Sequence, residues 1–558
     1  MVALLPSFSL VLWVIGATLA IVRGMAAHYQ VSRFAVNAIT IIGTGFAVDI
    51  SLFFHIRFKE ERVKDGSSVQ QAVTRMLATS GRAVVFSATT LCICLSGTLL
   101  FNEYYLTSMA ASIMIVALTA AMGALVLLPL LYLTLADRIF LLSTDPITEI
   151  LDSFAHRNSN TPISAGSIRK SSGFYFRIAS FVMQFPLWFL LSIGGMLSVF
   201  FFVFVFKLRM GSWGIFLVPV DSSVRQTFDS LKTNVNYGAN SVIEVYMQTV
   251  SETQLRSPEF LTALDAYSSE LEAIPAVSRV VNILRFNPQY NFSEYIAYIN
   301  GSLNSSSILV NPFYLTDAKS IVRTSISLSL EKDDPTMPGV IDSIRSLTSS
   351  PQITRFLSVF GCTGDPVSDY DVQSDLRSNF PGFISILVFG MYLMILIVTR
   401  SILLPIQAII TAFLSLVSAF GILVLALQDG PNLSGTLDPL QLLFIFTISF
   451  ALSLDYEMFM LSRIQEIWEI KKEHKFAISL GIELSAKTIS FAAFSLCIIL
   501  IEFMTSKIIL LVCIGTVYHL LFVNYSPNLY FLGNRHYSDY GRDDYPVLCG
   551  ARDDVLQW

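Results

Sequence analysis

Two aspartates stand at matching positions inside two strongly hydrophobic stretches of the chain. An offset of 406 residues superimposes stretch 43–61 on stretch 449–467 and aligns Asp49/Asp455, Phe53/Phe459, Arg57/Arg463 and Glu60/Glu466. A carboxylate in hydrocarbon costs about 2.5–3.5 kcal/mol on insertion scales, so such residues are rare and usually functional. A facing pair would titrate as one coupled site, which suits loading a proton on one side of a membrane and releasing it on the other. A structural hydrogen bond between helices is the alternative.

The composition is that of a polytopic membrane protein. Hydrophobic residues make up 53% of the 558 residues and charged residues 14%, and the mean hydropathy is +0.62. Because about 20 apolar residues cross the hydrocarbon as a helix, the sequence predicts ten spans. They are 2–22, 34–54, 83–101, 104–136, 178–206, 378–399, 401–428, 439–462, 488–506 and 508–531.

Internal repetition predicts two parallel pseudo-repeats of these spans. Leu-Leu-Pro opens both residues 4–6 and 403–405, and residues 80–92 align with 485–497 at an offset of 405. The predicted parts are a four-helix bundle, a cytoplasmic linker, one span, an extracytoplasmic domain, a five-helix bundle and a cytoplasmic tail. Their bounds are 1–136, 137–177, 178–206, 207–377, 378–531 and 532–558. We expect the first half to lack an initial span, a polar domain and a second span, through an incomplete chain rather than a genuinely short form.

The large polar segment reads as alternating strands and helices. Strands are expected at 241–250, 278–284, 324–330 and 355–361, and amphipathic helices at 257–274 and 337–350. This β-α-β-β-α-β order predicts a ferredoxin-like α+β domain.

Basic residues of the short loops set the expected orientation. Loops 56–82, 137–177 and 463–487 are rich in Lys and Arg and lie on one side, so we assign that side and both termini to the cytoplasm. N-glycosylation sequons on the opposite side favour a plasma membrane or a secretory-pathway membrane. They begin at Asn291, Asn300, Asn304 and Asn432.

Several further side chains of the spans have an expected role. Tyr456 follows Asp455 and would donate a hydrogen bond across the interface, or would simply pack. Gly43 and Gly45 favour close helix approach. Arg57 and Arg463 are expected to anchor their helices at lipid headgroups. Other polar groups are expected at peripheral or packing positions: Glu457, paired with Lys or Arg, and the histidines His55 and His519.

No Walker loop, GxSxG, HExxH or CxxC motif occurs, so the sequence predicts neither an enzyme nor a metal or cofactor site, and no nucleic-acid partner.

Three stretches carry a family resemblance. Residues 49–73, 80–91 and 452–466 resemble the span signatures of the MmpL family, a branch of the resistance–nodulation–division (RND) transporter superfamily. The resemblance implies proton-driven transport of lipids or other hydrophobic molecules, with a porter domain at 207–377 and a proton relay of Asp49, Asp455 and Tyr456. The family has an Asp-Tyr pair in each half. Asp455 and Tyr456 match this pair, whereas Ile50 stands where a tyrosine would follow Asp49. The implied partners are membrane lipids, a lipid-like substrate and protons, and a homo-oligomer stays open. A Patched-like or sterol-sensing receptor of the same fold, or an inactive fragment, is the alternative.

Overall fold

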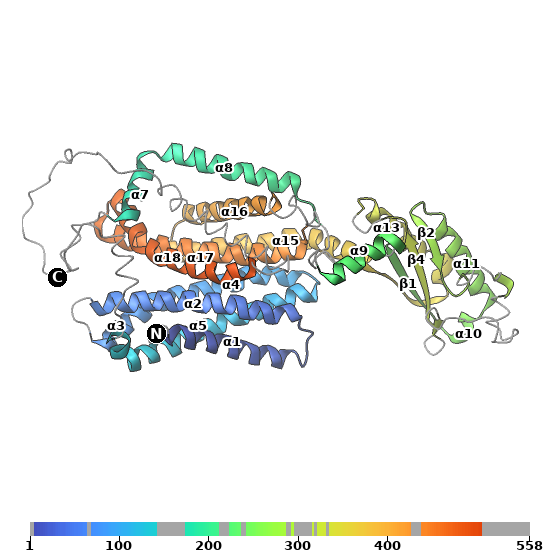
Figure 1. Cartoon of the computed structure of the whole chain (residues 1–558), viewed down its shortest axis with the longest axis horizontal. Helices are drawn as coiled ribbons and strands as arrows, with labels where there is room; N and C mark the ends of the chain where they lie inside the picture. The colour runs from blue at the N-terminus through green and yellow to red at the C-terminus, as the bar shows by residue number, and fades with distance from the viewer. Residues whose placement is uncertain are drawn as a thin grey trace, which may run out of the picture.

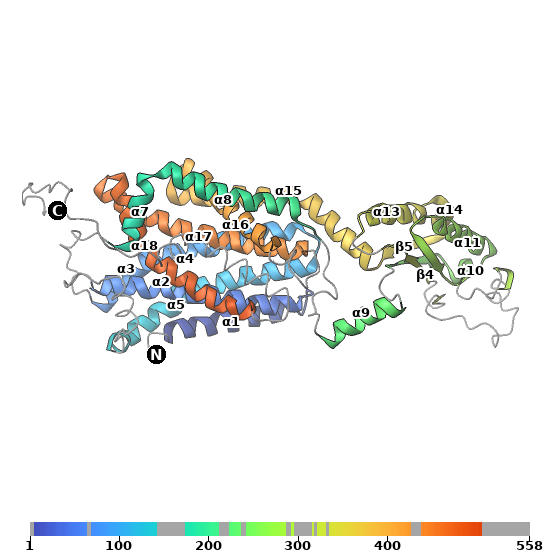
Figure 2. The same ribbon diagram turned by 45° about the horizontal axis from the view of Figure 1, so that its top comes forward.

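The computed structural model describes most of the chain, in ten ranges. They are residues 5–63, 68–141, 173–210, 222–235, 241–285, 292–294, 315–316, 321–330, 334–425 and 437–504. A bundle of long helices runs along the molecule, and a small β-sheet domain projects from one end (Figures 1 and 2). Within the described ranges, nine helices are long and apolar enough to cross a membrane. The expected span at 508–531 and His519 lie outside these ranges, as do the asparagines of the four sequons.

The first half of the bundle is built from four membrane-length segments. They are α1 (Leu5–Met25), α2 (Arg33–Val63), a composite third segment and α5 (Tyr104–Leu141). The third segment, called the α4 rod below, consists of α3 (Val69–Met76), a π-helical turn (Leu77–Gly81), α4 (Arg82–Ser96) and a 3-10 turn (Gly97–Leu100). The third segment begins earlier than the predicted 83–101 because Ser68 and Gln71 form a capping box that starts α3. α1, α2 and α5 all pack against one another.

The second half is built from α8 (Pro186–Lys207), α15 (Asp365–Thr399), α16 (Leu403–Leu423), α17 (Pro439–Lys471) and α18 (His474–Met504). The side chain of Asp438 caps α17 by accepting from the backbone N–H of Leu440 at 2.9 Å, and Pro439 occupies its first turn. Both α2 and α17 continue well past their predicted spans, so Arg57 and Arg463 still lie on helix rather than in loops.

The predicted span 178–206 is two helices. α7 (Phe174–Gln184) ends at Phe185, and Pro186 begins α8 in a different direction (Figure 1). Pro186 suits the first turn of a helix and not its interior, because it has no backbone N–H to donate. The carboxylate of Glu483, on α18, accepts a hydrogen bond from the backbone N–H of Phe176 at 2.9 Å and so caps α7. α7 therefore lies across the end of the bundle, and the span starts at Pro186.

The sheet domain confirms the ferredoxin-like prediction. Its strands β1 (Val242–Thr249), β2 (Val277–Val281), β4 (Ile321–Leu328) and β5 (Leu357–Thr363) are antiparallel in the order β2-β4-β1-β5, with β3 (Leu315–Thr316) paired to β4. Helices α11 (Pro258–Glu272) and α13 (Met337–Thr348) supply the expected crossovers. Three short helices complete the domain: α9 (Ser223–Val235), α10 (Glu252–Leu255) and α14 (Pro351–Thr354).

One face of the sheet forms the core of this domain. Alternate residues of β1 are buried, including Ile243, Val245 and Met247, and they share one cluster with apolar residues of α11 and α13. A second, larger cluster fills the helical bundle. The domain and the bundle thus have separate cores.

β5 passes directly into α15. Gly364 lies between them at φ 129°, a conformation that residues with a side chain rarely adopt. α15 then continues for 35 residues, through Pro381, into the bundle. A single helix therefore joins the sheet domain to the second repeat.

Candidate functional site

The structure brings Asp49 and Tyr456 together. The hydroxyl of Tyr456, on α17, donates to Oδ2 of Asp49, on α2, at 2.6 Å. Asp49 is only 5% exposed, although it lies midway along a membrane-length helix. The predicted hydrogen bond across the interface between the repeats is therefore present.

Asp455 has a hydroxyl partner that sequence reasoning missed. The hydroxyl of Ser87, on α4, donates to Oδ2 of Asp455 at 2.5 Å. α4 belongs to the first repeat and packs against α17 of the second, while α18 packs against α2 in the corresponding arrangement. Each aspartate is thus held by a hydroxyl from the opposite half of the molecule.

The two hydroxyls do not occupy equivalent positions in the repeat. Ile50 stands where the first repeat would match Tyr456, and Ala492 stands where the second would match Ser87. Asp49 therefore uses a phenol from the helix that carries Asp455, whereas Asp455 uses an alcohol from α4. Both carboxylates keep one short hydrogen bond although the repeats have diverged.

An aromatic contact lies one turn along the two helices from the aspartates. The rings of Phe53 and Phe459, which are equivalent in the repeat, have centroids 4.4 Å apart. α2 and α17 thus meet through side chains both at the aspartates and one turn beyond them, so the two predicted stripes do face each other.

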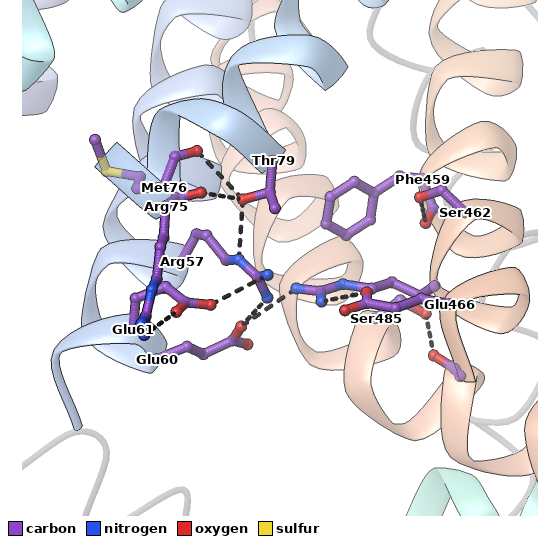
Figure 3. A network of polar contacts seen from close by, with 12 residues as sticks. Arg57, Glu60, Glu61, Arg75, Met76, Thr79, Phe459, Ser462, Glu466 and Ser485 are labelled. Carbon is purple, nitrogen blue, oxygen red and sulfur yellow. Dashed lines mark hydrogen bonds and ion pairs between the residues drawn. The ribbon is translucent and has the colours of Figure 1, made fainter. Parts of the chain in front are cut away.

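A layer of charges follows one further turn along, toward the end of the bundle away from the sheet domain. Figure 3 shows Glu60 and Glu61 gathered around Arg57, with dashed lines reaching across to the second repeat. Oε2 of Glu60 lies 2.9 Å from Arg57 and 3.2 Å from Arg463. The side chains of Arg57 and Arg463 are 8% and 16% exposed. The expectation that these arginines point to lipid headgroups was wrong, because both turn inward to carboxylates.

Other predicted residues lie around this interface. Gly43 is buried where a Cβ would lie 3.5 Å from Val14, an ordinary contact, and Gly45 is also buried. His55 approaches the hydroxyl of Tyr132 through Nδ1 at 3.4 Å. Glu457 accepts from the hydroxyl of Thr411 on α16 at 3.4 Å, and among the described residues it forms no ion pair with the expected Lys or Arg. Glu457 therefore points away from the two aspartates, as its spacing from Asp455 predicts.

A model of the MMPL family matches residues 2–170 and 217–521, which is most of the chain. The "Putative membrane protein SCO6666" of Streptomyces coelicolor is 24% identical over 90% of this chain and 61% of its own length. The "Trehalose monomycolate exporter MmpL3" of Mycolicibacterium smegmatis is 26% identical over 89% of this chain and 47% of its own. The "Heme uptake protein MmpL11" of Mycobacterium tuberculosis is 26% identical over 85% and 45%.

Among solved structures, the fold resembles that of the hedgehog release protein Disp from the water bear Hypsibius dujardini. The TM-score is 0.58 at 11% identity, covering 94% of this chain and 65% of that one. The chain spans about half the length of the curated relatives it matches, from 45% to 61% in the three named above. With most of its length matched by the family model, the span signatures in place and a small antiparallel sheet domain beside the bundle, the chain is a member of the MMPL family, as its resemblance to MmpL proteins predicted.

Proposed function

We propose that the chain works as a proton-coupled transporter of lipids or other hydrophobic molecules. The observation that carries the proposal is the pair of aspartates at the interface between the repeats, each hydrogen-bonded to a hydroxyl of the opposite half. A carboxylate accepts a hydrogen bond, whereas a protonated carboxyl also donates one. Loading or releasing a proton therefore changes the hydrogen bond that each aspartate can form with its partner side chain in the other repeat.

This arrangement supplies a physical route from proton binding to motion. The membrane potential provides about 2.3 kcal/mol per charge per 100 mV, which is enough to bias a two-state equilibrium appreciably. Because Tyr456 and Asp455 share one helix, protonation of Asp49 acts on the helix that carries the second aspartate. The two sites are therefore expected to exchange protons as a coupled pair.

The substrate class comes from the relatives. The MmpL3 relative is named an exporter of trehalose monomycolate, and another MmpL11 relative is named an exporter of mycolic acid-containing lipids. We extend a lipid-like substrate to this chain. In this proposal the sheet domain lies outside the cytoplasm, and the charged end of the bundle faces the cytoplasm.

Replacing each aspartate by asparagine tests the proposal. Asparagine keeps the shape and can accept the hydroxyl, but it cannot carry the proton. In proteoliposomes with an internal pH dye and a labelled lipid, Asp49→Asn and Asp455→Asn are expected to abolish proton-driven lipid movement and lipid-driven proton flux.

The matched control is Glu457→Gln, which neutralises a carboxyl two residues along the same helix that does not face the aspartates. Full activity in both asparagine variants would end the proposal. Lipid binding that ignores both aspartates and pH would favour the sterol-sensing alternative.

A further inference from the structure

The charged layer between the repeats is strongly asymmetric, and the sequence explains why. Arg57 is satisfied within its own half: its guanidinium lies 2.9 Å from Glu60 and 3.1 Å from Glu61, and its Nε donates to the hydroxyl of Thr79 at 3.0 Å. All of these groups come from α2 and the turn before α4. Arg57 is thereby fixed to the first repeat (Figure 3).

Arg463 has lost two of the corresponding partners. Ile467 stands at the position that matches Glu61, and Leu484 stands at the position that matches Thr79. Neither side chain can accept a hydrogen bond. Arg463 keeps the ion pair with Glu466 on its own helix at 3.0 Å and makes its other contact across the interface, with Glu60 at 3.2 Å.

Glu60 and Glu466 are equivalent in the repeat but do different things. Glu60 bridges both arginines and its side chain is 35% exposed, whereas Glu466 pairs with Arg463 on its own helix and is 54% exposed. Within the residues that the structure describes, Arg57 forms no ion pair with Glu466. Glu60 therefore ties the two repeats together at this end of the bundle.

We propose that the Glu60–Arg463 ion pair is a latch that closes the interface between the repeats at the end away from the sheet domain. The latch covers Phe459 and then Asp455, which follow toward the middle of the same helix. Closing it keeps water from reaching the aspartates from that end, and opening it frees α17 from α2. Because Arg57 stays bound to its own repeat, Arg463 is the partner that leaves.

The inference concerns closure of the interface and can be measured whether or not protons drive transport. The first readout is hydrogen–deuterium exchange of the full chain in lipid nanodiscs, followed in peptides covering 53–63 and 459–467. Glu60→Gln and Arg463→Gln are each expected to speed exchange there by about tenfold, the effect of losing one charged hydrogen-bond partner. Glu466→Gln, the equivalent position without a cross-repeat contact, should leave exchange near the native rate.

The double variant Glu60→Gln/Arg463→Gln separates a latch from general loosening. If the two side chains act through each other, the second substitution adds little to the first. Additive effects, or equal effects of Arg463→Gln and Glu466→Gln, would overturn the inference. Should Arg463→Gln fail to fold, Arg463→Lys keeps the charge, and its exchange should lie between that of the native chain and that of Glu60→Gln.

A second readout is the proton leak of proteoliposomes without substrate. Opening the latch is expected to raise the leak in Glu60→Gln and Arg463→Gln and not in Glu466→Gln. If exchange responds as predicted while Asp49→Asn leaves transport intact, the latch stands and the proton-coupling proposal falls, so the two failures are distinguishable.

Discussion

At the scale of single residues, the buried aspartates of the two repeats are hydrogen-bonded by different types of side chain. A buried carboxyl without a hydrogen-bond partner is costly, so each aspartate needs a donor. The first repeat has isoleucine where the second has Tyr456, and the second has Ala492 where the first has Ser87. Each aspartate therefore receives a hydrogen bond from a hydroxyl of the other repeat.

Removing these donors one at a time tests whether they act in the relay. We expect Tyr456→Phe and Ser87→Ala to lower transport by roughly tenfold each, since each leaves one carboxyl short of a charged hydrogen bond. The pH profile of transport should shift as well, because each hydroxyl donates to a carboxyl group that the relay is proposed to protonate.

Transport assays from pH 5 to 9 in proteoliposomes would measure this shift. Ser96→Ala is a control on the same helix, since its hydroxyl donates to the backbone carbonyl of Ile93. An unchanged profile in both test variants would show that the hydroxyls are structural only.

The sequence singled out Asp49 and Asp455, because an acidic residue in a hydrophobic helix stands out against its surroundings, and Tyr456, because it follows Asp455 as in the MmpL family. Ser87 gave no such signal, since serine is common in membrane helices and usually donates to its own backbone. Arg57 and Arg463 were misread because each helix was considered alone. An arginine at a helix end suits a headgroup, and although Glu60 and Glu466 stand three residues along the same helices, only the packing shows that both arginines are largely covered and that Glu60 reaches Arg463.

At the scale of elements, α8 is attached to the bundle mainly through α16. The hydroxyl of Ser418 donates to the backbone carbonyl of Leu197 at 2.9 Å, and a Cβ added at Gly421 would overlap the backbone carbonyl of Phe200. Many other side chains of α8 are exposed on the bundle surface. Small residues on α16 thus let two backbones approach closely, as is common between membrane helices.

Gly421→Ala is expected to separate these two helices. The added methyl group meets backbone, which cannot rotate away, so α8 must shift and lose the contact at Ser418. We expect a loss of about 1–3 kcal/mol, measured as a lower midpoint of thermal unfolding in detergent. Gly195→Ala on α8 is the matched control, since a Cβ there meets nothing within 4 Å, and alanine suits a helix better than glycine. Equal midpoints for the two variants would contradict this account of the packing.

The order of elements was largely predictable, and their limits were less so. Alternation and helical periodicity in 241–361 were sufficient for the sheet domain, because β1 alternates buried and open residues and α11 and α13 each bury one face. The break at Pro186 was missed because hydrophobicity continues across it, from Phe181 through Trp188. Hydropathy measures how apolar a segment is and does not register a change of direction.

At the scale of the whole molecule, the sheet domain is tied to both repeats. α15 carries it into the second repeat, while Asp375 on α15 accepts from the backbone N–H of Asn102 at 2.9 Å and from its side-chain amide at 2.8 Å. Asn102 follows the turn that ends the α4 rod. The helix that holds Ser87 is therefore linked, through one loop, to the helix that leads to the sheet.

Breaking this link should weaken communication between the aspartates and the sheet domain. Asp375→Ala removes both contacts to Asn102, and we expect transport to fall by roughly threefold to tenfold, as for the loss of one or two hydrogen bonds. The proton leak of the same vesicles should stay at its native level, because the two aspartates and the Glu60–Arg463 ion pair keep their contacts.

Asn379→Ala is the control for this prediction. Asn379 donates to the same carboxylate at 2.9 Å but lies on α15 itself, so its loss breaks no link between the repeats. If Asn379→Ala lowers transport as much as Asp375→Ala does, the contact with Asn102 has no special part in coupling.

The continuity of α15 also fixes how far a small movement travels. At 1.5 Å per residue, its 35 residues make a rod of about 50 Å. Pivoting such a rod by about 5° at its buried tip would swing the opposite tip through about 4 Å, roughly the diameter of a methyl group. A small rotation at the end of α15 inside the bundle would thus be amplified, by lever geometry alone, into a much larger displacement of the sheet domain.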